Sequence, residues 1–386
     1  MRILYLSSPP YADCDFPLIK EFQKMGHEVF YLIDLPPYFL HTTLIDIKEQ
    51  IRENGILKAS VYKEFLIYKN YLSLDNVYVI NRTRKSAFCS KNISIYWQLT
   101  LFIKKLKPDV VNIIGNIDVQ SLALLIFRKK LVLTVHDPFP HTGEQSFRKE
   151  LFRRLAMKTI PRFVLLNEKQ MDDFIRIYKL HPKQVFINRL GVYDCIHNFC
   201  NKSDAYINSE NNILFFGRIS PYKGIEYLLD AMKIVHRNVP NAKLTIAGSG
   251  KIYFDISSVQ NLSYLDIRNH YISMEELADL INHAAIVVCP YTDATQSGVV
   301  MTAYSLCKPV IATYVGGLIE MVDDDKSGIL VPPKDIEALA NAIIKILNDV
   351  PKQLKMKEYI RTQYFLGDKS WNSIAKKYIS VYVQCL

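Results

Sequence analysis

Short apolar segments alternate along the whole chain with segments whose apolar residues recur at helical spacing. A parallel sheet covered by helices on both faces gives this alternation, because its strands are buried on both sides. In the first half, strands are predicted at Ile3–Leu6, Val29–Ile33, Val77–Ile80, Val110–Ile114, Leu131–Val135, Phe163–Leu166 and Val185–Ile187. In the second half, they are predicted at Ile213–Phe216, Leu244–Ala247, Leu262–Ile267, Ile286–Cys289, Val310–Thr313 and Gly328–Val331. The fold class is therefore predicted to be α/β, with two Rossmann-like series of strands.

A polar stretch over residues 198–212, rich in Asn and Ser, separates the two series. We expect one Rossmann-like domain over residues 1–195 and a second over residues 205–365. The amphipathic pattern of residues 366–386 predicts a closing helix, in which Trp371 serves as a packing anchor.

Some helix ends follow from the residue types. Asp15 is expected to cap a helix that Gly26 ends, and Asp335 is expected to cap another helix. Residues 42–75 have apolar residues at helical spacing and are predicted to be helical. Two interpretations of that segment remain open: packing in the core, which we favour, or an exposed element facing an acceptor or a membrane.

The net charge of +10 in this chain of 386 residues is unevenly distributed. Residues 1–190 hold 29 basic and 18 acidic residues, whereas the remainder is nearly balanced. A solvated basic surface, attraction to an anionic membrane or phosphorylated acceptor, and nucleic-acid binding all fit this asymmetry. No nucleic-acid motif accompanies the charge, so we expect no nucleic-acid partner.

The cysteine pattern and the lengths of the apolar runs bear on metal binding, on the cellular compartment and on membrane insertion. The seven cysteines are scattered with no C-x-x-C pair, so we expect incidental thiols, no metal site and a reducing cytoplasm. No apolar run approaches the roughly 18 residues that a membrane-spanning helix needs.

Two cations follow the predicted strand Ile213–Phe216. The turn runs Gly217-Arg218, then Lys223-Gly224, and an amphipathic helical pattern comes next. Open α/β sheets bind ligands at the carboxyl ends of their strands, and an Arg and a Lys above a helix start suit a diphosphate. The alternative is a salt bridge inside the C-terminal domain. We favour a nucleotide diphosphate site.

A second such turn follows the predicted strand Ile286–Cys289. A helix is predicted to begin near Ser297, so its first backbone N–H groups would point at an anion. Ser297 suits the cap position, and Gly298 allows a ligand to approach the backbone closely. Capping alone is the alternative interpretation of this segment.

These residues resemble glycosyltransferase family 4 (glycosyl transferases group 1), the retaining group with the GT-B fold. The similarity covers nearly the whole chain. It rests on Gly217-Arg218 with Lys223-Gly224, Leu244–Gly250, Glu275-Glu276-Leu277, Ala284–Val288, Lys308–Thr313, Gly316-Gly317 and Glu320. The resemblance implies two Rossmann-like domains facing across a cleft, the first on the acceptor side and the second binding a nucleotide sugar. It also implies that the closing helix crosses back to the N-terminal domain.

The resemblance assigns catalytic roles to three residues. Arg218 and Lys223 match the cationic pair that neutralises the donor diphosphate as the glycosidic bond breaks. His136, after the strand Leu131–Val135, matches a histidine of the cleft that contacts the donor sugar; His141 is a weaker candidate. The donor-binding residues implied are Gly217, Gly248, Ile267, Arg268, Gln296, Ser297, Gly298, Val299 and Thr302.

The chain departs from the family pattern at three places. Much of the family has two glutamates eight positions apart in the donor site, and this chain has Ala294 and Thr302 there. This variant resembles a subset of the family. Arg268 stands where the family usually has Gly, and the loop Ser7–Asp13 lacks the paired glycines common after the first strand.

The resemblance therefore implies a metal-independent, retaining hexosyltransferase without a cofactor. Its donor would be a UDP- or GDP-sugar and its acceptor a hydroxyl, possible settings being surface polysaccharide or glycolipid assembly at the inner face of the membrane. A catalytically silent sugar-nucleotide-binding subunit and a UDP-sugar epimerase remain as alternatives. A dinucleotide dehydrogenase is disfavoured, because no G-x-G-x-x-G follows the first strand.

Overall fold

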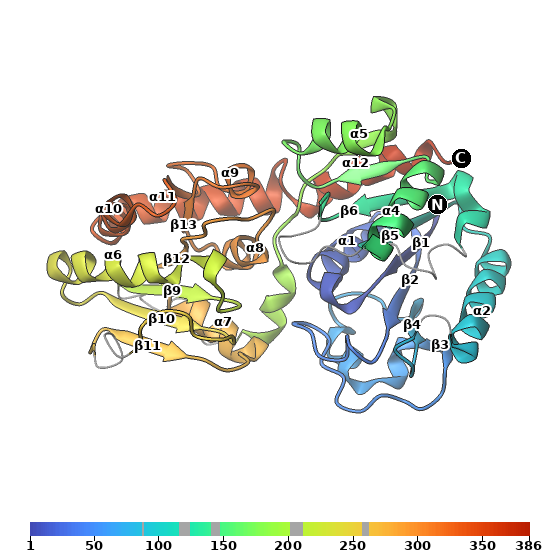
Figure 1. The fold of residues 1–386 in the computed structure, drawn as a ribbon, viewed down its shortest axis with the longest axis horizontal. Coiled ribbons are helices and arrows are strands. Elements are labelled where there is room, and N and C mark those ends of the chain that lie inside the picture. The colour runs from blue at the N-terminus through green and yellow to red at the C-terminus, as the bar shows by residue number, and fades with distance from the viewer. Residues whose placement is uncertain (87–88, 116–123, 140–146, 201–210, 257–261) are drawn as a thin grey trace. The chain divides into compact units, whose positions relative to one another are not determined.

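A computed structural model describes residues 1–86, 89–115, 124–139, 147–200, 211–256 and 262–386. The chain divides into two compact units, each with its own sheet (Figure 1). The N-terminal unit comprises Met1–Leu190 and Trp371–Leu386, and the C-terminal unit comprises Gly191–Ser370. Each unit is an α/β layer structure built on a largely parallel sheet.

The sheet of the N-terminal unit has the strand order β3-β4-β2-β1-β5-β6-β7-β8. Its strands are β1 (Arg2–Ser7), β2 (Glu28–Leu35), β3 (Gly55–Lys58), β4 (Val77–Asn81), β5 (Val110–Ile114), β6 (Leu131–Val135), β7 (Phe163–Leu165) and β8 (Val185–Ile187). All neighbours pair in parallel except β3, which runs antiparallel to β4. Strand β1 lies between β2 and β5, where the direction of the strand order reverses.

Among the described residues, the α-helices of this unit are α1 (Ala12–Lys24), α2 (Ser90–Leu106), α4 (Phe147–Thr159), α5 (Met171–Tyr178) and α12 (Trp371–Val383). The last of these packs on α1, where the ring of Phe22 contacts those of Tyr378 and Tyr382. Trp371 is buried, which confirms the predicted packing anchor. The C-terminal helix thus belongs to the N-terminal unit although it follows the second sheet in the sequence.

The sheet of the C-terminal unit is wholly parallel, in the order β11-β10-β9-β12-β13-β14. Its strands are β9 (Asn212–Phe216), β10 (Lys243–Ala247), β11 (Leu265–Arg268), β12 (Ile286–Cys289), β13 (Val310–Thr313) and β14 (Gly328–Val331). Its helices are α6 (Ile225–Asn238), α7 (Met274–His283), α8 (Gly298–Ser305), α9 (Leu318–Met321), α10 (Ile336–Leu347) and α11 (Val350–Arg361). The predicted strands are all found, and the predicted α/β class is confirmed.

The helix predicted over residues 42–75 is wrong. That segment contains strand β3 and two 3-10 helices, Ala59–Val61 and Lys63–Tyr68. The apolar spacing arises because successive tight turns bring Phe65 and Tyr68 into the core, while β3 hydrogen-bonds along β4. Phe65 and Tyr68 agree with packing in the core, whereas Val61, Leu66 and Ile67 of the same segment are exposed.

The predicted cap at Asp15 is also wrong. Helix α1 begins at Ala12, so Asp15 lies inside it, fully buried, and accepts a hydrogen bond of 2.9 Å from the Tyr31 hydroxyl. In contrast, Asp335 caps α10 by accepting from the Ala338 N–H at 2.9 Å, as predicted. Across the described ranges, no helix is long and apolar enough to cross a bilayer.

Candidate active site

The candidate site in the C-terminal unit lies where its strand order reverses. Strand β9 has β10 on one side and β12 on the other, so the chain leaves β9 in one direction and returns to it from the other. Ligands of open α/β sheets bind at this switch point, beyond the carboxyl ends of the strands. The loops after β9 and β12 hold both turns that the sequence singled out. Topology therefore brings the two predicted halves of the site together.

The loops after β9 and β10 are joined by backbone hydrogen bonds and by a close approach that leaves no room for a side chain at Gly248. The Gly217 N–H donates to the Ala247 carbonyl at 2.9 Å, and the Ile219 N–H donates to the Ser249 carbonyl at 3.1 Å. A Cβ at Gly248 would lie 1.9 Å from the Gly217 carbonyl oxygen. Both glycines have positive φ, +114° at Gly217 and +151° at Gly248. Residues with a side chain rarely adopt this backbone conformation.

The loops after β9 and β12 also meet. A Cβ at Gly224 would lie 2.1 Å from the Pro290 carbonyl oxygen, and the Thr292 N–H donates to the Tyr222 carbonyl at 2.8 Å. A Cβ at Gly217 would approach a methyl group of Val299 to 3.4 Å. The predicted residues Gly217 and Val299 are thus neighbours, although 82 positions separate them in the chain.

Lys223 is a buried cation in this pair of loops. Its side chain lies over the ring of Tyr291, with Nζ 3.7 Å from the ring centre, and Nζ is 5.1 Å from the Tyr222 ring centre. Burial lowers the pKa of Lys223 to about 8, and the positive charge of Arg218 acts in the same direction. In the described part of the chain, no carboxylate pairs with Lys223. A buried charge without a counterion is unfavourable, so the position suits an anionic ligand.

Arg218 is exposed at the tip of the same turn. Among the described residues, none forms a hydrogen bond or ion pair with its guanidinium. The intradomain salt bridge considered as the alternative for this cationic pair is therefore absent from the part of the chain described. Two cations close enough to repel each other are available to a ligand that carries more than one negative charge.

Helix α8 begins beside these cations. Ser297 occupies its N-cap position, but the side chain forms no capping hydrogen bond; its hydroxyl lies 3.4 Å from the Tyr291 hydroxyl instead. The Ser297 N–H points to the sulfur of Met321 at 3.3 Å. A Cβ at Gly298 would lie 3.0 Å from the ring of Tyr193. The capping explanation of Ser297 is therefore wrong, and backbone N–H groups of the first turn are left for a ligand or solvent.

Two further predicted donor-site residues lie at this end of α8. The Thr302 hydroxyl donates to the Gly298 carbonyl at 2.8 Å, so its oxygen can accept, but its proton is already engaged. Gln296 is half-buried directly before the cap residue. Ala294, which stands where much of the family has glutamate, is buried, and its carbonyl accepts from the Gly317 N–H at 3.1 Å.

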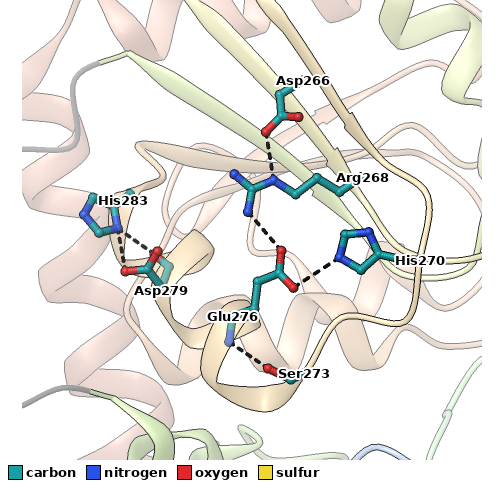
Figure 2. Close-up of polar contacts among 7 residues, drawn as sticks. All are labelled: Asp266, Arg268, His270, Ser273, Glu276, Asp279 and His283. Carbon is teal, nitrogen blue, oxygen red and sulfur yellow. Dashed lines mark hydrogen bonds and ion pairs between the residues drawn. The ribbon is translucent and has the colours of Figure 1, made fainter.

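Arg268 is held by carboxylates (Figure 2). Its Nε donates to Asp266 at 2.8 Å, and a terminal nitrogen donates to Glu276 at 2.9 Å. Glu276 also contacts His270 at 3.3 Å, and the hydrogen bond from Arg268 lowers the pKa of Glu276. A base contact from this guanidinium would compete with two ion pairs. The backbone carbonyl of Arg268 accepts from the Gly248 N–H at 3.0 Å, which places the end of β11, with Ile267, beside the glycine turn.

In the N-terminal unit, His136 follows β6. Its Nδ1 lies 2.9 Å from a carboxylate oxygen of Asp137, and the centre of its ring is 5.4 Å from that of Tyr11. Tyr11 in turn covers Gly115, where a Cβ would lie 2.3 Å from the phenol ring. Tyr11 comes from the loop after β1, and Gly115 follows β5, so these contacts bracket the switch point of this sheet. His141 lies outside the described residues.

The sequence did not predict the raised pKa values of Asp13 and Asp15 in helix α1, which follows Tyr11. Burial raises the pKa of Asp15 to about 7, while hydrogen bonds from Ser7 and Tyr31 oppose that shift. Burial and the neighbouring charge of Asp15 raise the pKa of Asp13 to about 7 as well. Tyr11, Tyr193 and Tyr291 were also missed, because tyrosines carry no motif and their roles depend on partners distant in the sequence.

The match to a family model lies in the C-terminal unit. The family model of glycosyl transferases group 1 matches residues 210–349. A glycosyltransferase of Methanocaldococcus jannaschii, itself uncharacterized, is 35% identical over 185 residues, which is 45% of this chain and 45% of that protein. The alpha-D-kanosaminyltransferase of Streptomyces kanamyceticus is 27% identical over 149 residues, 38% of this chain and 39% of that protein. The chain thus spans less than half of these relatives.

The solved structures that resemble this chain cover nearly all of it. The Anabaena protein Alr3699/HepE, crystallised in complex with UDP, aligns over 99% of this chain and 100% of its own, with a TM-score of 0.67 and 17% identity. Sucrose-phosphate synthase from Thermosynechococcus elongatus covers 100% of this chain and 98% of its own, with a TM-score of 0.67 and 17% identity. Residues 210–349 are thus similar to the glycosyl transferases group 1 family, and the two α/β units have the GT-B fold of these solved structures.

Proposed function

We propose that this protein is a glycosyltransferase that transfers a sugar from a UDP- or GDP-sugar to a hydroxyl acceptor. The observation that carries the proposal is the placement of Lys223 and Arg218. Both cations lie at the carboxyl end of β9 without a carboxylate partner among the described residues, beside the start of α8. This arrangement suits a nucleoside diphosphate, which carries two adjacent phosphate groups. Relatives named as glycosyltransferases support the same class.

The proposed reaction retains the configuration at the anomeric carbon. The bond between that carbon and the diphosphate oxygen breaks, and a bond to the acceptor oxygen forms on the same face of the sugar. The proton of the acceptor hydroxyl passes to the leaving phosphate oxygen, so no protein nucleophile is needed. Arg218, Lys223 and the first N–H groups of α8 stabilise the negative charge that develops on the leaving group. We propose that these groups do so without a metal ion.

The remaining site residues are proposed to bind the donor. Gly217 and Gly248 let the diphosphate and nucleoside approach the backbone, and the end of β11 at Ile267 and Arg268 lies on the base side. Gln296, Ser297, Gly298, Val299 and Thr302 border the phosphates and ribose. His136 is proposed to position the donor sugar, a role that rests on the family resemblance.

The acceptor is proposed to be a lipid-linked glycan or another glycolipid at an anionic membrane surface, as in surface-polysaccharide assembly. The excess of basic residues in the first half of the chain supports this class. A reducing compartment, the cytoplasm, is the proposed setting, because the seven cysteines are scattered along the sequence with no C-x-x-C pair.

A sugar-nucleotide-binding protein without turnover is the second candidate. The observation that favours it is the pair Ala294 and Thr302, which replaces the two glutamates of much of the family. Such a protein would bind the donor without breaking its glycosidic bond.

A donor panel tests the proposal. Purified protein is incubated with individual UDP- and GDP-sugars, with and without a crude lipid extract, and release of the nucleoside diphosphate is measured. Release from one donor, increased by the extract, is the expected result. Thermal stabilisation by a donor without release in any mixture would favour the second candidate. Interconversion of UDP-sugars without an acceptor, detected by NMR, would identify an epimerase instead.

A further inference from the structure

Helix α2 of the N-terminal unit has apolar residues on both of its sides. Ile95, Leu99 and Ile103 are buried in the core against the sheet. On the opposite side, Ile93, Trp97 and Leu101 are 54%, 64% and 47% exposed. Their spacing of four residues places them on one stripe along the helix surface. Packing in the core accounts for the first set, whereas no packing among the described residues of this unit accounts for the second.

Tryptophan makes this stripe unusual. The chain has two tryptophans, and Trp371 is only 7% exposed. Trp97 is at the centre of the stripe, one helical turn from each of the other two residues. Scattered single apolar residues on a surface need no explanation, but a contiguous stripe centred on an exposed tryptophan indicates an interaction surface.

The surroundings of the stripe are basic. Helix α2 contains three lysines, at 91, 104 and 105, and no Asp or Glu; Lys107 follows at its C-terminal end. Lys130 Nζ donates to the Pro108 carbonyl at 2.7 Å, which brings the 3-10 helix Leu124–Lys130 beside this end of α2. That segment adds an exposed isoleucine, Ile126, together with Arg128 and Lys129. Figure 1 shows α2 on the flank of the N-terminal unit, beside β3 and β4.

Two kinds of occupant fit an apolar stripe, and the charge distinguishes them. A second copy of the chain would bring lysines of α2 against lysines of its partner, with no carboxylate on either helix to pair with them. An anionic bilayer provides hydrocarbon for the aliphatic residues of the stripe and an interfacial region that tryptophan favours. It also provides phosphate groups for the lysines. The favoured occupant is therefore a lipid surface.

We propose that α2 is a membrane-docking helix. Ile93, Trp97 and Leu101 enter the interfacial region of an anionic bilayer, while Lys104, Lys105 and the basic end of the neighbouring 3-10 helix contact lipid phosphates. This surface lies on the N-terminal unit, to which we assign the acceptor. Docking is a property separate from sugar transfer and is measured without a donor.

The test uses the full-length protein and vesicles of phosphatidylglycerol and phosphatidylcholine in equal parts, with pure phosphatidylcholine vesicles as the comparison. Co-sedimentation gives binding, and tryptophan emission reports insertion. We expect binding to the anionic vesicles with a blue shift of the emission. The Trp97→Phe variant leaves only the buried Trp371, so it should bind without that shift.

Matched pairs of variants test whether α2 is the surface that binds the vesicles. The double variant K104E/K105E should weaken vesicle binding by at least about tenfold, because each basic residue near an anionic surface contributes measurably to binding. The control K376E/K377E reverses two adjacent exposed lysines on α12 of the same unit and should bind nearly as well as the starting protein. Trp97→Ser should also weaken binding, whereas Ile177→Ser, at a residue 45% exposed on α5, should not.

Three results of the vesicle experiments would overturn the proposal. They are an absence of binding to the anionic vesicles, binding with no change in Trp97 emission, and equal losses in the α2 variants and their controls. A concentration-dependent dimer that Trp97→Ser dissociates would assign the stripe to a second copy and would also overturn it. A melting temperature close to that of the starting protein verifies that each variant is folded.

Discussion

Lys223 Nζ lies 3.7 Å from the centre of the Tyr291 ring, which joins the loop after β9 to the loop after β12. The ring face provides a weakly negative environment that partly compensates for the missing carboxylate. This contact fixes a cation at the switch point of the sheet before any ligand arrives. A charge held in advance needs little rearrangement when negative charge develops on a leaving diphosphate.

The charge of Lys223 predicts a pH dependence. Its pKa is lowered to about 8, so the side chain is cationic below that pH and becomes neutral above it. Affinity for a nucleoside diphosphate should therefore fall as pH rises through about 8, and the rate constant kcat/KM for the donor should fall with it. Titration of UDP or GDP between neutral and alkaline pH measures this.

Lys223→Met provides the control for that profile. The variant should bind the nucleotide weakly at every pH in the range, without the decline above pH 8. The neighbouring Cys289 does not complicate the profile, because burial raises the pKa of its thiol to about 11. An identical decline in the variant would assign the titration to another group.

Arg218→Ala should reduce kcat on the order of 100-fold, since it removes a charge aimed at the leaving group. The folded structure should be little affected, because Arg218 is exposed and has no partner among the described residues. Arg237→Ala is the matched control: that arginine is also exposed and lies on α6, where its Nε donates to the Lys233 carbonyl of the same helix at 3.1 Å. Equal activity of the two variants would exclude Arg218 from the chemistry.

Gly248→Ala should lower the stability of the C-terminal unit and abolish donor binding. The new methyl group would lie 1.9 Å from the Gly217 carbonyl oxygen, so the two loops would have to separate. Gly26→Ala is the control, because φ is +80° there but no atom lies within 4 Å of the added Cβ. It should cost about 1–2 kcal/mol of stability from backbone strain alone. Thermal unfolding and nucleotide titration compare the two, and equal effects would argue against a close loop contact.

Asp15 predicts how stability depends on pH. Its carboxyl has a pKa of about 7 in the folded chain against an ordinary value of 3.8. The folded state therefore holds a proton that the unfolded state has lost between about pH 4 and pH 7, and stability falls as pH rises through that window. The raised pKa of Asp13 acts in the same direction.

Asp15→Asn should remove that part of the pH dependence. Above pH 7 the variant should be more stable than the starting protein, by up to a few kcal/mol, because a neutral amide can still accept from Tyr31 without a buried charge. Melting temperatures of both proteins at pH 5 and pH 8 give the comparison. Parallel changes in the two proteins would show that Asp15 does not carry the effect.

The strands could be predicted because each is a buried apolar run bounded by polar or glycine residues. Asp335 could be predicted as a cap because the capping contact is local, between a side chain and an N–H three residues away. Residues 42–75 could not, since their apolar spacing satisfies a helix equally well and the deciding contact is the pairing of β3 with β4, a tertiary event. The same holds for Asp15, whose partner Tyr31 lies on β2.

The residues of the candidate site divide in the same way, into those of local motifs and those whose contacts depend on the tertiary fold. Arg218, Lys223 and the glycines belong to short motifs, so the sequence alone identified them as candidates. The side-chain environments did not follow, because they depend on residues far apart in the chain. The placement of Lys223 over Tyr291 and the two ion pairs of Arg268 needed the folded sheet.

The most direct test of the account is a calorimetric titration of UDP and GDP into the starting protein, into Lys223→Met and into the control Lys233→Met. Lys233 is an exposed lysine on α6 that pairs with Asp230. We predict that one of the two nucleotides binds the starting protein and the control equally, and that Lys223→Met weakens this binding by about tenfold or more. Binding that is unchanged in Lys223→Met, or absent from the starting protein for both nucleotides, would contradict a diphosphate site at the carboxyl ends of β9 and β12.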